Sequence, residues 1–210
     1  MKLLEKILVP TDFSPGAEDA LQVAACVAKQ FQSEITLLHV VPGSSHRYSD
    51  AAGMIKTSVE EELHDAERRI REQGVETVHT VVDFGVPFYQ INQHADQGQV
   101  NFIIMGARQE ASDGPCRLGT TAGGVRRIAS KPVWIVKPGT TPAIRKILGP
   151  VNFTDASGRS LQNAIHLSRS FQAELTVLRV AAGSSPASKS PEKTAAEAEA
   201  AGVEREQLLL

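Results

Sequence analysis

The chain contains an internal duplication, and this feature constrains its fold more than any other. The stretch "KILVPTDFSPGAEDALQVAACVAKQFQSEITLLHVVPGSS" begins at Lys6, and "KILGPVNFTDASGRSLQNAIHLSRSFQAELTVLRVAAGSS" begins at Lys146. The two stretches align without a gap at an offset of 140, and 17 of the 40 paired positions are identical. This identity is too high for chance, so the chain carries two copies of one structural unit.

The two copies differ in completeness. We expect a complete domain over residues 1–138, a linker over 139–145 and a partial second copy over 146–210. The linker lies within "KPGTTPAIR", whose prolines, glycine and threonines are typical of a connection between units. In the second copy, a strand–helix–strand pattern is followed by a Ser, Pro and Lys run, and then by an Ala and Glu run that favours the start of another helix.

The first copy alternates short apolar segments with amphipathic ones. The apolar segments predict strands at 6–10, 34–41, 75–85, 101–106 and 131–137. Helical periodicity predicts helices at 15–31, 55–74, 87–96 and 120–130. Nearly all-apolar strands separated by helices indicate a parallel sheet that is covered on both faces. We therefore predict an α/β fold, a doubly wound five-stranded parallel sheet of the Rossmann-like kind, together with a partial second copy.

Composition excludes several classes of protein. Hydrophobic residues make up 41% and charged residues 22% of the chain, which fits a folded globular protein. A net charge of -2 gives no basic excess, so we expect no nucleic-acid partner. No apolar stretch reaches the roughly 18 residues of a membrane span, so we expect no membrane partner. Two cysteines make no disulfide framework, and we expect a cytoplasmic protein.

Two loops of the predicted sheet meet where such sheets bind ligands, beyond the carboxyl ends of their strands. The first loop, "PTDFS", begins at Pro10, and the second, "MGARQ", begins at Met105. The carboxylate of Asp12 either accepts a hydrogen bond from a ribose hydroxyl or a base amine, or it is an ordinary turn residue beside Ser14.

The second loop continues into a predicted helix and also allows two interpretations. In the first, the backbone N–H groups that follow Gly119 bind a phosphate, Thr120 and Thr121 add hydroxyl donors, and Arg108 adds charge. In the second, this is an ordinary connection from strand to helix with a threonine as the N-cap.

Residues for catalysis or metal binding are not arranged in any recognisable pattern. No histidine pair is spaced with a third ligand as a zinc site requires. Cys116 lies beside Arg117, which would lower the pKa of a thiol, but no base is positioned next to it by sequence. We expect no catalytic residue and no metal ligand.

The chain resembles the universal stress protein family in its tandem form. The stretches that carry the resemblance are "KILVPTDFS", "ITLLHVV", "FIIMGA" and "LGTTAGGVRRIASKPVWIVKP". The resemblance covers the first copy and the first strand, helix and strand of the second. It implies an open sheet with strand order 3-2-1-4-5, usually dimeric through the last strand. It also implies ATP binding in many members and no defining enzymatic activity.

The ATP-binding pattern of that family is G-x2-G-x9-G-[S/T], and this chain matches it in part. Gly106 fills the first position and Gly119 with Thr120 the last, but Gln109 stands in place of the middle glycine. The resemblance further implies that Asp12 contacts the adenosine and that the backbone of Val40 faces the adenine. The predicted binding residues are Pro10, Thr11, Asp12, Val40, Met105, Gly106, Arg108, Gln109, Gly119, Thr120 and Thr121.

These observations predict a universal-stress-type regulatory protein with one degenerate ATP site in the first copy, Mg²⁺ entering only with ATP, and no dedicated catalysis. We expect a homo-oligomer. In the second copy Asn152 replaces the acid and the phosphate loop is absent, so this copy forms no complete site. The alternative is a dimerising stress or partner-binding module that binds no nucleotide. An enzyme of a related nucleotidyl-transfer fold would need H-x-G-H or S-G-G-x-D-S, and the chain has neither.

Overall fold

The computed structural model describes residues 4–43, 52–107, 118–151 and 155–179. The chain divides into two compact units, Met1–Pro142 and Ala143–Leu210. The expected linker, 139–145, spans this division.

The first unit contains a five-stranded parallel sheet with strand order β3-β2-β1-β4-β5, so the predicted doubly wound fold is confirmed. In this sheet Pro10 lies opposite Leu38, and Ile7 lies opposite both Ile35 and Phe102. The strands are β1 (Lys6–Pro10), β2 (Glu34–Pro42), β3 (Val78–Gly85), β4 (Phe102–Gly106) and β5 (Val133–Val136).

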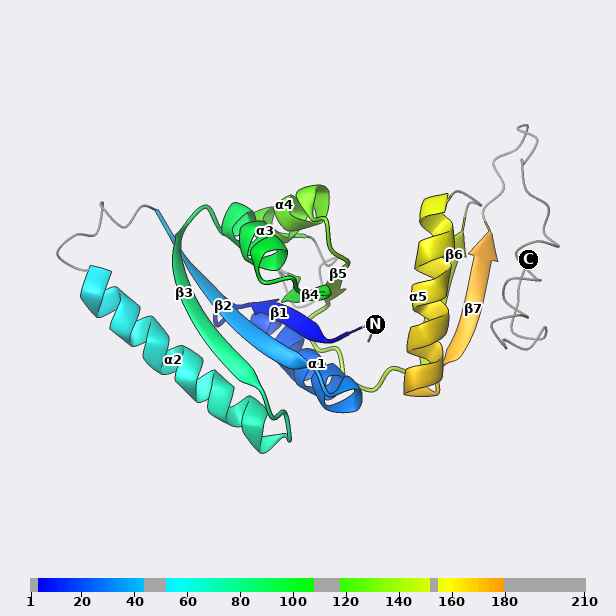
Figure 1. Ribbon diagram of the computed structural model, residues 1–210, viewed down its shortest axis with the longest axis horizontal. Coiled ribbons are helices and arrows are strands. Elements are labelled where there is room, and N and C mark those ends of the chain that lie inside the picture. The colour runs from blue at the N-terminus through cyan, green and yellow to red at the C-terminus, as the bar shows by residue number, and fades with distance from the viewer. Residues whose placement is uncertain (1–3, 44–51, 108–117, 152–154, 180–210) are drawn as a thin grey trace. The chain divides into compact units, whose positions relative to one another are not determined.

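Helices cover both faces of this sheet. The helices are α1 (Pro15–Phe31), α2 (Ala52–Glu72), α3 (Pro87–Gln97) and α4 (Thr120–Ile128). Figure 1 shows α1 and α2 on one face of the sheet and α3 and α4 on the other. The chain therefore changes face between β1 and β4, and this is the switch point at which doubly wound sheets bind ligands.

The first helix begins where the sequence predicts. The hydroxyl of Ser14 accepts a hydrogen bond from the N–H of Ala17 at 3.3 Å, and Pro15 occupies the first helical position. The face of α1 that packs on the sheet consists mostly of alanine and valine, and these small side chains let the helix lie close to the strands.

One contact between α1 and β4 is made by bare backbone. A Cβ on Gly106 would lie 2.3 Å from the carbonyl oxygen of Gly16, and a Cβ on Gly16 would lie 2.7 Å from that of Ala107. No side chain fits at such distances, so both positions require glycine because of the close approach.

The second unit contains a shorter version of the same pattern. It is formed by β6 (Lys146–Val151), α5 (Asp155–Phe171) and β7 (Glu174–Arg179), with the two strands parallel. The helix packs on one face of this small sheet, over a core of Val151, Leu161, Ala164, Ile165, Leu175 and Val177. The further helix expected after the second strand lies outside the described residues.

The other face of this small sheet is exposed. Leu148 is 60% exposed and Leu178 is 40% exposed. Their counterparts in the first copy, Leu8 and Leu38, are 1% and 0% exposed, in a core that also contains Ile91 of α3 and Val125 of α4. Among the helices that the structure describes, none combines the length and apolarity needed to cross a bilayer.

Candidate functional site

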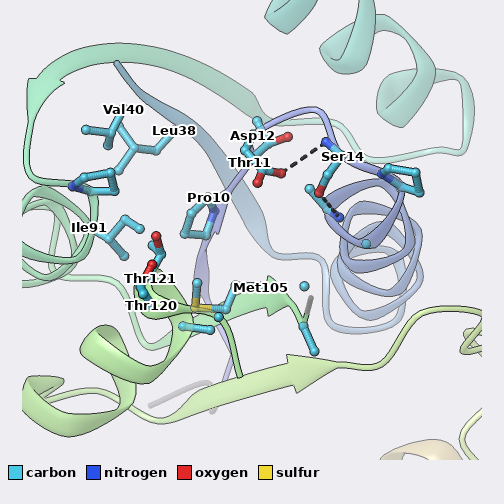
Figure 2. A pocket seen from close by; sticks show the side chains of 18 of the residues that line it. Pro10, Thr11, Asp12, Ser14, Leu38, Val40, Ile91, Met105, Thr120 and Thr121 are labelled. Atoms are coloured by element: carbon cyan, nitrogen blue, oxygen red, sulfur yellow. Dashed lines mark hydrogen bonds between the residues drawn. The ribbon is translucent and has the colours of Figure 1, made fainter. Parts of the chain in front are cut away.

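A pocket of about 760 Å³ opens at the carboxyl ends of β1 and β4. Figure 2 shows the Asp12 turn on one side of it, Met105 and the two threonines of α4 on another, and Leu38, Val40 and Ile91 between them. This volume lies within the range of about 300–1,000 Å³ that is typical of small-molecule sites.

The pocket brings together most of the predicted binding residues, although they come from four separate segments of the chain. Arg108 and Gln109 lie outside the described residues. The nine others all line the pocket: Pro10, Thr11, Asp12, Val40, Met105, Gly106, Gly119, Thr120 and Thr121.

Sequence reasoning missed the part of the pocket that α3 contributes. Pro87 and Ile91 line it from this helix. A helix that leads from β3 to β4 must cross the face of β2 and β1. The expected strand order therefore implied that this helix would line the pocket. The pocket lining that was missed also includes Ser14, Pro15, Gly16, Ala17, Leu38, Ala107, Ala122 and Pro138.

Asp12 is a turn residue, as one of the two interpretations of the sequence has it. Its Oδ1 accepts the backbone N–H of Ser14 at 3.1 Å, which closes a turn, and Figure 2 shows this bond beside the Ser14 cap. The hydroxyl of Thr11 accepts the N–H of Phe13 at 3.0 Å in the same turn. Asp12 nevertheless remains exposed and lines the pocket. Of its two carboxylate oxygens, only Oδ1 accepts a hydrogen bond from the described residues, so Oδ2 remains as an acceptor for a ligand.

The N-terminus of α4 lies at the pocket without a side-chain cap. The alternative of a threonine N-cap is wrong, because the N-cap is Gly119 and Thr120 is already the first helical residue. Glycine has no side chain that could accept the N–H groups of the first turn, whereas Ser14 caps α1. The positive end of the α4 dipole therefore lies at the pocket with no capping side chain of its own.

His39 lies next to the Asp12 turn. Its Nδ1 is 2.9 Å from the carbonyl oxygen of Thr11, and its ring stacks on Phe13 with centroids 4.8 Å apart and planes at 13°. Burial lowers the pKa of His39 below the ordinary 6.5, while the hydrogen bond to Thr11 and the charges of Asp12 and Glu62 act in the opposite direction.

Among the described residues, no other reactive groups gather at the pocket. Cys116 lies outside the described residues. The pair formed by His94 Nε2 and Asp83 Oδ2, 2.8 Å apart, does not line the pocket. Among the described residues there is no group of three or more side chains suited to a metal ion. Within the described part of the lining, Asp12 is the only charged side chain.

The family model described as the universal stress protein family matches this chain twice, over residues 4–137 and 143–210. The chain belongs to the universal stress protein family. The two matches agree with the tandem form that the internal duplication predicts. A universal stress protein of Methanocaldococcus jannaschii is 30% identical over 142 residues, which cover 64% of this chain and 83% of that protein.

Solved universal stress proteins have the same fold. One from Archaeoglobus fulgidus, in complex with dAMP, is 25% identical, with a TM-score of 0.52 over 65% of this chain and 100% of that one. Another from Archaeoglobus fulgidus DSM 4304 has a TM-score of 0.78 over 95% of this chain and 75% of that one. At 23% identity, this second likeness concerns the fold alone.

Proposed function

We propose that the pocket of the first unit binds an adenine nucleotide and that the protein acts as a nucleotide-responsive regulator. One observation carries this proposal: the Asp12 carboxylate and the uncapped N-terminus of α4 line the same pocket. A nucleotide has hydroxyl donors on its ribose and anionic acceptors on its phosphates, and these two groups of the protein complement them.

The lining of the pocket supports a specific orientation of the ligand. The apolar side chains of Leu38, Val40 and Ile91 form the wall on which a base would pack. A ribose would donate hydrogen bonds to Asp12, and phosphates would accept them from the first-turn N–H groups of α4. The relative solved with dAMP supports an adenine nucleotide as the ligand. We propose ATP, with Mg²⁺ entering only on its phosphates.

We infer that this site has no dedicated catalysis. The described lining contains no histidine, cysteine or lysine. Its one carboxylate already accepts the N–H of Ser14, which makes it a ligand acceptor more than a base.

Asp12→Asn tests the proposal most sharply. The asparagine oxygen still accepts the N–H of Ser14, so the turn is kept while the charge is lost. Losing a hydrogen bond to a charged acceptor costs about 1.5–3 kcal/mol, so ATP affinity should fall about tenfold or more. Calorimetric titration of the wild type and the variant measures this difference. Asp65→Asn, an exposed change on α2, is the control. Equal ATP affinity in a folded Asp12→Asn variant would contradict the proposed role.

We also propose that the site is degenerate because Gln109 replaces the middle glycine of the family pattern. A side chain at this position would crowd the phosphates, and a positive φ would add strain of about 1 kcal/mol. Gln109→Gly should therefore tighten ATP binding about fivefold, and the binding of adenosine, which lacks phosphates, much less. Titration of both proteins with both ligands measures this. A flat or weaker ATP affinity in the variant would show that Gln109 is not the obstacle.

A second proposal concerns assembly. The exposed leucines of the second unit, Leu148 and Leu178, form an apolar sheet face whose counterpart in the first copy is buried. We propose that this face associates with a second copy of the chain, which makes the protein a homo-oligomer.

A further inference from the structure

His39 lies on the opposite face of the sheet from the pocket. Side chains alternate along a strand, and the neighbours of His39 on β2, Leu38 and Val40, both line the pocket. The histidine side chain therefore points toward the α1 and α2 face, where Glu62 of α2 is the nearby acid. It nevertheless contacts the turn that forms one wall of the pocket.

Two consecutive residues of β2 hold the backbone of Thr11. Its N–H donates to the carbonyl of Leu38 at 2.9 Å, and its own carbonyl lies 2.9 Å from Nδ1 of His39. A carbonyl only accepts, so the proton of this bond is on Nδ1. The imidazole thus supplies a ring N–H donor to the chain just beyond the end of β1.

The residue after Asp12 needs such support. Phe13 has a φ of 60°, in the left-handed region, which costs an L-residue about 1–2 kcal/mol. Its ring stacks on the ring of His39. The hydrogen bonds within the turn set its internal shape, whereas the contacts with Leu38 and His39 set its place against the sheet.

We propose that His39 is a positioning residue for the pocket: it holds Thr11 and Phe13 from the far face of the sheet, and so fixes the Asp12 carboxylate between them toward the ligand. The nature of that ligand rests on the proposed function.

Two variants separate the contacts of His39. His39→Asn keeps an N–H donor near the position of Nδ1 and loses the ring, while His39→Phe keeps a ring for stacking and loses the donor. Hydrogen exchange of the Phe13 and Ser14 amides should be about fivefold faster or more in His39→Phe, as expected for one lost hydrogen bond, and largely restored in His39→Asn. His64→Phe, an exposed change on α2, should leave both amides unchanged.

The ATP affinity of single and double variants distinguishes a positioning role from a general loss of stability. ATP binding should weaken about fivefold in His39→Phe, but should not weaken further when the same change is made in the Asp12→Asn protein, because the effect acts through Asp12. Additive effects of the two changes would overturn the proposal.

The wild-type protein provides a check that no folding defect can obscure. Nitrogen NMR of neutral His39 should show the proton on Nδ1, and a proton mainly on Nε2 would overturn the proposal. If the wild type binds no ATP, the proposed function fails, but the exchange and tautomer results still decide the role of His39. If ATP binds while either of those results goes against the prediction, only the role of His39 fails.

Discussion

At the scale of single residues, the burial of His39 predicts that stability depends on pH. Burial is the largest influence on its pKa and lowers it, since a charged imidazole loses solvation at this position. Asp12 and Glu62 are the acids that oppose this effect. Between the lowered pKa and the ordinary value of 6.5, the unfolded chain binds a proton that the folded protein does not. The folded state therefore loses stability as pH falls below the ordinary value, and this loss stops below the lowered pKa.

The direction of this pKa shift predicts how the free energy of unfolding changes with pH. Above about pH 7 both states hold a neutral His39, so the histidine contributes no pH dependence there. The stability advantage of the wild type over His39→Asn should shrink between about pH 7 and about pH 5. Urea unfolding of both proteins at the two pH values measures it, with His64→Asn as the control for removing a histidine. An advantage that grows on acidification would mean that the folded state prefers the charged ring.

Individual residues also show what the sequence could predict about the site. Repeated patterns and the family motif led to Asp12 and Gly119, and the structure places both at one pocket. The place of Ile91 in the pocket and the contacts of His39 with Thr11 and Phe13 were missed, because each joins segments that are far apart in the chain. Asp12 itself was presented as either a turn residue or a ligand acceptor, and only the geometry shows that its two oxygens allow both.

At the scale of elements, the spacing of α3 and α4 depends on one glycine. A Cβ on Gly124 would lie 2.7 Å from Cγ and 2.8 Å from Cβ of Phe88, whereas a Cβ on Gly123 would meet no atom within 4 Å. From the sequence alone, both glycines are equally poor helix formers. The sequence could not separate them, because the difference comes from the packing of α3.

The two glycines form a matched pair for mutagenesis. Gly123→Ala should raise the free energy of unfolding by up to about 1 kcal/mol, since alanine favours a helix and has room there. Gly124→Ala should lower it by about 1–3 kcal/mol, because Phe88 must move. Urea denaturation of both variants measures the two effects. The same response in both would show that packing against Phe88 does not matter.

The predicted helices and strands mostly agree with the structure, and the differences lie at their ends. The second helix was predicted at 55–74 and spans Ala52–Glu72. The third strand was predicted from residue 75 and begins at Val78. Apolar periodicity identifies the middle of an element, whereas its ends depend on local contacts. One example is Arg71, whose side chain donates to the carbonyls of Glu76 and Val78 between these two elements.

At the scale of the whole molecule, the duplication places similar sequences in different surroundings. Leu8 of the first copy is buried, whereas its counterpart in the second copy, Leu148, is exposed. Lys6–Glu34 and Lys146–Glu174 form the same ion pair in both copies, at 3.8 and 3.7 Å. The local strand–helix–strand structure is therefore repeated in both copies. Helices that cover the second face of the sheet, as α3 and α4 do, are described only in the first copy.

This contrast predicts the behaviour of the protein in solution. If the exposed face of the second unit associates with another copy, replacing Leu148 and Leu178 together by glutamine should shift the oligomer to monomer. Light scattering over a range of concentrations measures the mass. Met54→Gln, at a residue of α2 that is 78% exposed, should leave the mass unchanged. A monomeric wild type, or an oligomer unaffected by the double change, would contradict the proposed assembly.

The backbone contact between Gly16 and Gly106 has a consequence for how this protein can evolve. Neither glycine can acquire a side chain while the other element stays in place, so a single substitution at either position displaces the start of α1 from the end of β4. Both residues line the pocket, whose wall there consists of peptide groups. Substitutions elsewhere in the lining can therefore change the side chains around the pocket, while this part of its outline stays fixed.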